Sequence, residues 1–146
     1  MNRMVWIALF TALVVVLPGC SGPEKTCKKS AESYFSLLSS SSWGGMFKML
    51  TEQNRKSLDN NPKKFAYLME EVFEYKGSKN FRLKKLTPYA GRDSCSVQVV
   101  YDYSVKLRGK EEQAYDGVEE TWLFQKSPKD GLWYYHIPEG KQLGGF

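Results

Sequence analysis

A strict alternation of side-chain character over residues 95–107 narrows the choice of fold more than any other pattern in the chain. A period of two sends successive side chains to opposite faces of a strand, so this segment predicts one long strand with a buried face and an exposed face. Such a strand is typical of an antiparallel sheet that is covered on one side only. Its apolar or amphipathic positions are Cys95, Val97, Val99, Tyr101, Tyr103, Val105 and Leu107.

Three further strands are expected in the same half of the chain. Short segments rich in Gly, Pro and Asp separate the periodic stretches and are typical of turns between neighbouring strands. The sequence therefore predicts a four-stranded antiparallel meander. The other expected strands cover 81–86, about 113–126 and 132–137, with turns at 88–93, 108–111 and 128–131.

The segment that precedes the sheet has helical periodicity instead. Apolar residues recur at i, i+3, i+4 and i+7 from residue 27 onward, and four serines at 39–42 end that helix. A second short helix is expected over 43–50, and a third begins at Pro62 and ends at Gly77. The apolar stripes are Cys27, Ala31, Tyr34, Phe35 and Leu38, then Trp43, Phe47 and Leu50, then Phe65, Leu68, Met69, Val72 and Phe73.

Two to three helices followed by a four-stranded antiparallel sheet predict an α+β fold in which the helices cover one face of the sheet. The helical half begins with Ala31-x-x-Tyr34-Phe35-x-x-Leu38 followed by Trp43, and the last strand begins with Asp130-Gly131-Leu132-Trp133. Together with the order of elements, these segments resemble the nuclear transport factor two-like (NTF2-like) fold, also called cystatin-like, which small bacterial lipoproteins of unknown function use. The resemblance covers roughly residues 30–138. It implies a sheet curled into a cone, with a cavity between sheet and helices.

The N-terminus carries an export pattern. After Arg3, residues 4–17 form a stretch without charge that is short for a membrane span, which needs about 20 apolar residues, and fits a signal peptide. It ends in Leu17-Pro18-Gly19-Cys20, which resembles the lipobox of bacterial lipoproteins. The resemblance implies that the Cys20 thiol receives a diacylglyceryl group and becomes the first mature residue. Pro18 departs from the usual small or hydroxylic residue, and an uncleaved membrane anchor is the alternative.

These patterns divide the chain into a signal peptide at 1–19, a lipidated tether at 20–29, an α+β domain at 30–138 and a tail at 139–146. The expected location is the cell envelope, held at the membrane by the lipid. If the host has two membranes, the Ser21 that follows the cysteine resembles the pattern sent to the outer membrane, facing the periplasm.

Cys27 and Cys95 remain after the lipidated cysteine is set aside. In an exported protein an even number of cysteines favours a disulfide. Two buried, unpaired thiols are an alternative. A two-cysteine metal site is disfavoured, because the chain has one histidine and the spacing matches no zinc pattern.

Charge is distributed unevenly along the chain. Residues 20–92 contain fourteen Lys and Arg against seven Asp and Glu, whereas residues 93–146 contain six against nine. Because the cations are interspersed with acids in an exported chain, we expect no nucleic-acid partner. A solvated helix surface explains the basic half, and attraction to anionic lipid headgroups is the alternative.

Five aromatic residues have the spacing of inward-facing positions on the predicted sheet. Packing of the core is the simpler explanation, because aromatic rings dominate cores. The functional alternative is a pocket wall for a small apolar or amphipathic ligand, with the tyrosine hydroxyls orienting it. The candidate ligand-binding residues are Tyr101, Tyr103, Trp122, Trp133 and Tyr135.

The resemblance also raises the question of catalysis, because ketosteroid isomerase and scytalone dehydratase place an acid or a His–Asp pair in the cavity. The only histidine, His136, has a parity opposite to that of the inward residues of its strand, so we expect it in solvent. The same reasoning sends Asp102 to solvent. Asp116 and Glu120 share the parity of Trp122, so either is a candidate for an inward general base. The simpler expectation is that the third strand carries these acids on an exposed portion.

No phosphate-binding loop, metal cluster or activated nucleophile can be assembled, so the sequence predicts no catalytic residue, metal or cofactor. It favours a lipid-anchored, non-enzymatic accessory domain that binds a small ligand or another envelope protein. A cavity enzyme of the lyase or isomerase type and a purely structural envelope lipoprotein are the alternatives. The oligomeric state is left open.

Overall fold

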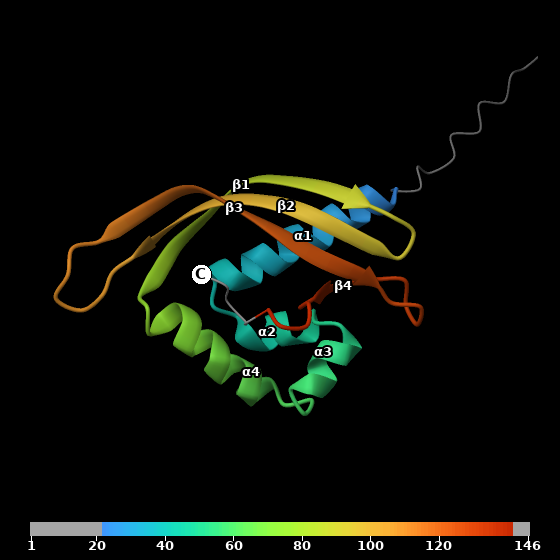
Figure 1. The fold of residues 1–146 in the computed structure, drawn as a ribbon, viewed down its shortest axis with the longest axis horizontal. Helices are drawn as coiled ribbons and strands as arrows, with labels where there is room; N and C mark the ends of the chain where they lie inside the picture. The colour runs from blue at the N-terminus through green and yellow to red at the C-terminus, as the bar shows by residue number, and fades with distance from the viewer. Residues whose placement is uncertain (1–21, 142–146) are drawn as a thin grey trace, which may run out of the picture.

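A computed structural model describes residues 22–141 as helices followed by strands (Figure 1). The sheet has the order β1-β2-β3-β4, and every neighbouring pair is antiparallel. The predicted α+β meander is thus confirmed, with four helices rather than two to three and a curved sheet that stays open. The elements are α1 (Pro23–Ser39), α2 (Trp43–Lys48), α3 (Glu52–Ser57), α4 (Pro62–Met69), the π-helical turn η1 (Glu70–Glu74), β1 (Ser78–Ala90), β2 (Ser94–Val105), β3 (Gln113–Lys126) and β4 (Trp133–His136).

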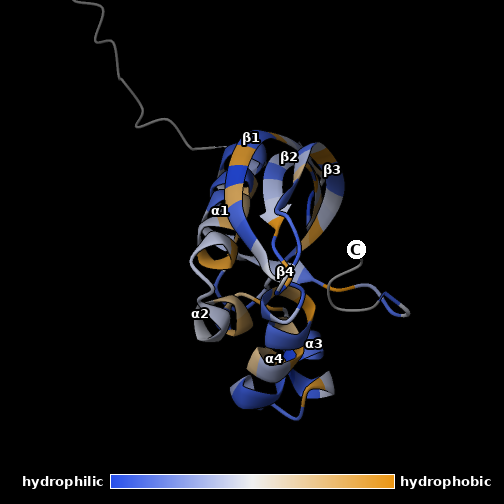
Figure 2. Ribbon diagram, turned by 90° about the vertical axis from the view of Figure 1, so that its left-hand side faces the viewer, coloured by the Kyte–Doolittle hydropathy of each residue, from blue (hydrophilic) through white to orange (hydrophobic). Residues whose placement is uncertain are grey.

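The helices all lie on the concave side of the sheet. In Figure 1 the sheet arches over α1, and α2, α3 and α4 lie beyond α1. The view in Figure 2 shows hydrophobic and hydrophilic residues alternating along β1, as expected for a strand that buries one face. The predicted stripe of α1 is buried in full, and it meets the inward residues of β2 and β3 in one core.

The helix that the sequence did not predict is α3. Its residues include no buried side chain, so it has no apolar stripe to detect. Its start is instead fixed by Thr51, whose side chain accepts a hydrogen bond from the backbone N–H of Asn54. Asn54 in turn bonds both backbone polar groups of Ile137, which ties α3 to the residue after β4.

The predicted boundaries differ most at β1 and α1. β1 extends through Pro88 to Ala90, so the turn predicted at 88–93 is shorter. Proline is tolerated there because β1 is an edge strand and needs no donor on its outer side. α1 begins at Pro23, so much of the predicted tether at 20–29 is helical, as suits proline in a first helical turn.

The disulfide between Cys27 and Cys95 is confirmed, and it joins α1 to β2 within the buried core. Its partners are 68 residues apart in the sequence. In the chain-entropy treatment, closing a loop of that size disfavours the unfolded state by about 4 kcal/mol.

Within residues 22–141, no helix is both long enough and apolar enough to cross a membrane. The signal peptide predicted at 1–19, the lipidation site Cys20 and residues 142–146 of the predicted tail lie outside the described residues.

Candidate ligand site on the concave face

The pairing of β2 with β3 determines which side chains line the concave face. Val97 lies opposite Trp122, and Val99 lies opposite Glu120. Val97, Val99 and Trp122 are all buried in the core. Glu120 lies opposite Val99 and two residues before Trp122, so its carboxylate is directed to the same side of the sheet. Glu120 is half-buried on this face, so the inward alternative holds for it and the simpler expectation of an exposed acid is wrong at this position.

A β-bulge changes the alternation further along β3. Tyr103 pairs with Tyr115, so two residues of β3, Asp116 and Gly117, face the single residue Asp102 of β2. Gly117 adopts a φ of 64°, a conformation that glycine accepts without a side-chain clash. The extra residue turns Tyr115 toward the concave face, where its ring stacks on Tyr103 at 4.9 Å.

Two groups of aromatic rings surround Glu120. On one side, Tyr34 of α1 stacks on Tyr135 at 4.3 Å and meets Trp122 edge-on at 5.2 Å. On the other side, the rings form a row that extends from the core toward the bulge. The neighbours in this row are Tyr101 with Tyr103 at 5.9 Å, Phe81 with Tyr103 at 5.6 Å, and Tyr103 with Tyr115 at 4.9 Å.

The backbone of β4 holds Tyr135 in this arrangement. One edge of β4 pairs with β3, and the other is bonded to the link between α2 and α3. The N–H of Tyr135 donates to the carbonyl of Met49 at 2.7 Å, and its carbonyl accepts from the N–H of Thr51 at 3.0 Å. Tyr135 is therefore fixed at both backbone polar groups, which gives the site a rigid wall.

Glu120 is the polar centre of this surface. Its Oε2 accepts a hydrogen bond of 2.8 Å from Nε1 of Trp122, and no described lysine or arginine forms a salt bridge with it. Burial and then the Glu120 charge raise the pKa of Tyr101 and that of Tyr135. Both phenols therefore stay protonated at neutral pH and can donate a hydrogen bond.

The predicted ligand-binding set is brought together only in part. Tyr101, Tyr103, Trp122 and Tyr135 lie in these two groups of rings, in which Tyr101 and Trp122 are buried in the core and Tyr103 and Tyr135 are partly buried. Trp133 lies elsewhere, because its Nε1 donates to the hydroxyl of Thr26 and its ring faces Lys126. That these residues bind a ligand stays a prediction. The sequence reasoning missed Tyr34, which it assigned to a helix stripe, and Tyr115, whose inward turn depends on the bulge.

The surroundings of three side chains differ from what their parity indicated: Asp102 and His136 were expected in solvent, and Asp116 was a candidate for the cavity. Asp102 is on the outer face, but its side chain is only 8% exposed because Arg82 and Lys84 cover it. Asp116 is exposed, since the bulge removes it from the inward parity. His136 is half-buried rather than solvated, beside residues at the start of β2.

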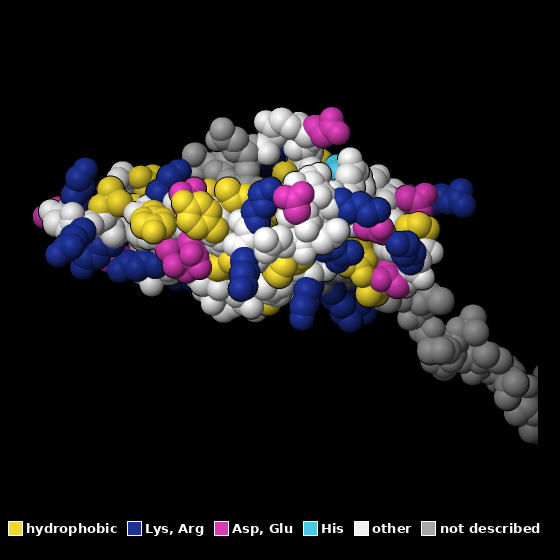
Figure 3. All heavy atoms as spheres, turned by 90° about the horizontal axis from the view of Figure 1, so that it is seen from below, with side chains coloured by type: hydrophobic (Ala, Val, Ile, Leu, Met, Phe, Trp, Pro, Cys, Tyr) yellow, Lys and Arg dark blue, Asp and Glu magenta, His cyan; other side chains and the backbone are white. Residues whose placement is uncertain are grey.

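A second surface with exposed aromatic rings lies on the helical side. Tyr67 and Tyr75 are 57% and 75% exposed, and a hydrogen bond to Glu71 raises the pKa of Tyr67. Figure 3 shows this side of the molecule, where hydrophobic side chains gather toward one end between acidic and basic ones. Among residues 22–141 no group of three or more His, Cys, Asp or Glu side chains is placed to bind a metal.

No protein-family model and no curated protein sequence matches the chain. Solved structures do resemble it. An NTF2-like protein with a cystatin-like fold from Novosphingobium aromaticivorans has 12% identity and a TM-score of 0.52, over 82% of this chain and 84% of the other. A candidate polyketide cyclase from Xanthomonas campestris has 12% identity and a TM-score of 0.53, over 80% and 93%.

A candidate dehydratase of the NTF2-like family from Streptomyces avermitilis has 10% identity and a TM-score of 0.52, over 77% of this chain and 92% of the other. Such low identities carry the fold and not the activity. The helices cover the concave face of a four-stranded meander, and the similar solved structures have the same architecture. The chain therefore has the NTF2-like, cystatin-like fold.

Proposed function

We propose that this chain is a lipid-anchored accessory domain of the cell envelope that binds a small ligand on the aromatic concave face. The observation that carries the proposal is the half-buried carboxylate of Glu120, which lies among aromatic rings without a cationic partner in the described chain. Its partners in the fold, the indole of Trp122 and the phenol of Tyr101, are both neutral, so its charge is left for a ligand to neutralise. The fold often provides ligand cavities at this place, which supports the proposal.

The chemistry of the surface defines the ligand. Aromatic rings offer contact to an apolar or aromatic body. Glu120 accepts hydrogen bonds, and a cationic group there would also face aromatic rings, which attract cations. We therefore expect an amphipathic molecule with an apolar body and one amine or hydroxyl group.

Three probes with the same body separate these contributions: ethylbenzene, 2-phenylethanol and 2-phenylethylamine. The expected result is that the alcohol and the amine raise the melting temperature of the protein more than ethylbenzene does. Glu120→Gln should weaken the effect of the amine most, because it removes the charge while keeping the shape. Glu119→Gln is the matched control, since Glu119 is exposed on the outer face and lies next to Glu120 in the chain.

The proposal would be contradicted if none of the three probes changed the melting temperature. An equal response of the two glutamate variants would also contradict it, because the response would then not depend on the concave face.

A cavity enzyme of the lyase or isomerase type is the second candidate, and the inward position of Glu120 is what favours it. A carboxylate in such surroundings can take a proton from a bound substrate. The two candidates differ in what happens to molecules recovered from the purified protein. Conversion of a recovered ligand by the wild type, but not by Glu120→Gln, would establish the enzyme.

A further inference from the structure

A pocket lies on the outer face of the sheet, at the end where β1 turns into β2. It has a volume of about 230 Å³. The pocket is separate from the aromatic concave face, because Cys95 and Phe124 beside it bury their side chains in the core on the opposite side of the sheet. The outer-face residues that line it are Tyr89, Ser94, Ser96, Leu123, Gln125 and His136.

Strand pairing places one side chain from each of the four strands in a row on this face. Tyr89 of β1 pairs with Ser96 of β2. Ser96 pairs with Leu123 of β3, which pairs in turn with His136 of β4. Gln125 lies two residues after Leu123, so its side chain is on the same face. Because neighbouring strands lie only about 4.8 Å apart, a small molecule in the pocket contacts side chains of several strands at once.

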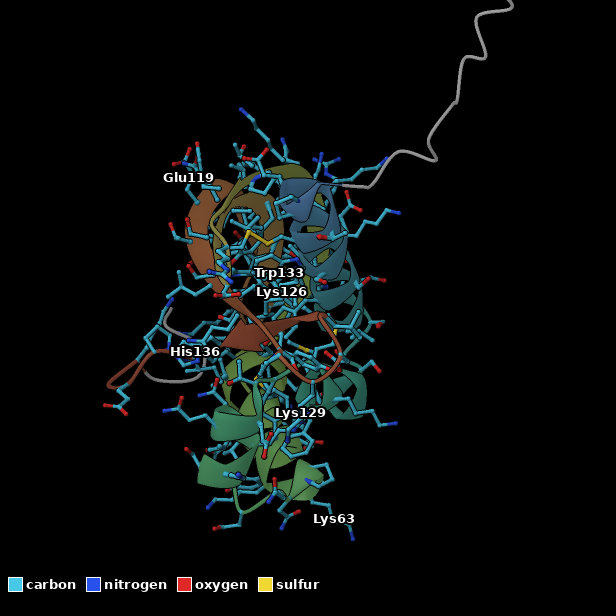
Figure 4. The ribbon with its side chains drawn as sticks, turned by 90° about the vertical axis from the view of Figure 1, so that its right-hand side faces the viewer. Lys63, Glu119, Lys126, Lys129, Trp133 and His136 are labelled. Atoms are coloured by element: carbon cyan, nitrogen blue, oxygen red, sulfur yellow. A yellow bond between two sulfur atoms is a disulfide. The ribbon has the colours of Figure 1, made fainter. Side chains whose placement is uncertain are left out.

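His136 brings a hydrogen-bond donor to the wall of this pocket. Its Nδ1 is enclosed and has no hydrogen-bond partner in the described part of the chain. An enclosed nitrogen with no acceptor to donate to favours the neutral tautomer that carries its proton on Nε2. The Nε2–H is then the group with which the imidazole can bind a ligand. Figure 4 shows His136 on the same side of the molecule as Glu119 of the outer face, away from α1.

The other groups of the pocket are uncharged as well. Ser94, Ser96 and Gln125 supply hydroxyl and amide groups that form no side-chain hydrogen bond within residues 22–141. Tyr89 is 60% exposed, and no described aromatic ring stacks on it. None of the described lining residues is Lys, Arg, Asp or Glu. An ion would find no opposite charge here, whereas an uncharged hydroxylated molecule would recover the hydrogen bonds that it loses to water.

We propose that this pocket binds one ring of an uncharged sugar. Sugar hydroxyl groups both donate and accept hydrogen bonds, which matches the mixture of donors and acceptors on Ser96, Gln125 and His136. The C–H groups on the face of a sugar ring suit the flat, electron-rich face of Tyr89. The volume is below about 300 Å³, the lower end of the range for drug-sized ligands, so the pocket accommodates a single ring.

The test uses the full-length, ¹⁵N-labelled chain in nanodiscs of phosphatidylcholine. Three probes share one six-membered ring: methyl β-glucoside, glucuronate and tetrahydropyran. The resonances of the Gln125 side-chain amide and of the Ser96 backbone amide report on the pocket. We expect the glucoside to shift both. Glucuronate should bind more weakly because its charge finds no partner, and tetrahydropyran should shift neither because it has no hydroxyl group.

Tyr89→Ala and His136→Phe should each weaken binding of the glucoside about five-fold, through the loss of a ring contact and of a hydrogen bond respectively. Tyr89→Phe should keep most of the affinity, since the ring remains. Tyr67→Ala is the matched control, because Tyr67 is 57% exposed on the helical side and does not line the pocket. Unchanged resonances of the core show that each variant is folded.

Two results would overturn the proposal. One is that the glucoside leaves the pocket resonances unchanged, or shifts them no more than tetrahydropyran or glucuronate does. The other is that Tyr67→Ala weakens binding as much as Tyr89→Ala, which would mean that the response does not come from this pocket. Neither result bears on the aromatic concave face, because Glu120 does not line this pocket.

Discussion

Glu120 and Asp102 are carboxylates of neighbouring strands that lie on opposite faces of the sheet and have different surroundings. Asp102 receives two hydrogen bonds from Arg82, at 2.7 and 3.2 Å, and one from the backbone N–H of Gly117 at 2.9 Å. The donors that face Glu120 are neutral, namely the indole of Trp122 and the phenol of Tyr101. The first carboxylate is satisfied within the fold, whereas the second retains capacity for a ligand.

The acid stability of the fold should depend on Asp102. Hydrogen bonds from Arg82 and then from Gly117 lower its pKa to about 2, below the value of about 3.9 in an unfolded chain. Because the folded-state pKa is the lower one, Asp102 stabilises the fold above about pH 4 and loses this contribution as the pH falls toward 2. Asp102→Asn should therefore be less stable than the wild type at pH 5 and lose less stability on acidification.

Urea unfolding at about pH 5, 3 and 2 measures this difference. Asp116→Asn is the control, since Asp116 is exposed at the same bulge. If Asp102→Asn and the wild type lose stability in parallel, the network around Asp102 does not contribute to the acid response.

At the scale of the elements, the bulge at Asp116 and Gly117 links the two faces of the sheet. On the outer face the N–H of Gly117 donates to Asp102, and on the inner face the bulge turns Tyr115 onto Tyr103. A change at this one position should therefore affect both the outer ion pair and the aromatic row.

Gly117→Ala tests that link. A Cβ would meet no atom within 4 Å, so the cost arises only from the backbone, where φ is 64°. An L-residue in this region costs about 1 kcal/mol, and we expect the free energy of unfolding to fall by that amount. Gly44→Ala is the control, because Gly44 lies in α2 with equally open space and should gain about 0.5 kcal/mol. Urea unfolding at pH 7 compares them, and a Gly117→Ala protein as stable as the wild type would contradict the assignment.

Elements with a clear periodicity were predictable from the sequence, and those fixed by backbone detail were not. The stripe of α1 and the alternation of β2 identified buried faces because burial of apolar surface dominates folding. Short α3 has no buried side chain, and its position depends on Asn54 bonding to Ile137, a contact far away in the sequence. For the same reason the site was found in part. The alternation along the third strand predicted an inward position for both Glu120 and Asp116. Asp116 is instead exposed, because alternation alone cannot show where a strand contains a bulge.

At the scale of the whole molecule, the proposed lipid anchor would determine how far the domain lies from the membrane. α1 begins at Pro23, so only a short stretch of chain separates it from Cys20. A diacylated cysteine holds a protein at a membrane effectively permanently, because each buried methylene contributes about 0.8 kcal/mol. The aromatic concave face would then lie close to the lipid surface.

Cys20→Ala should release the protein from the membrane fraction. The measurement is the distribution between membrane and soluble fractions, with mass spectrometry of the mature N-terminus. The double variant Cys27→Ala and Cys95→Ala is the control, and it should stay attached because it retains the acceptor thiol. Continued attachment of Cys20→Ala, or a mature chain that begins at another residue, would contradict lipidation.

The covalent link between Cys27 and Cys95 also governs how the molecule bears mechanical tension. A protein held at its N-terminus is pulled there whenever a bound partner moves away from the membrane. Without the link, such a pull would peel α1 away from the sheet one turn at a time. With it, only the residues before Cys27 can be drawn out, and the load then passes directly to β2 at the centre of the sheet.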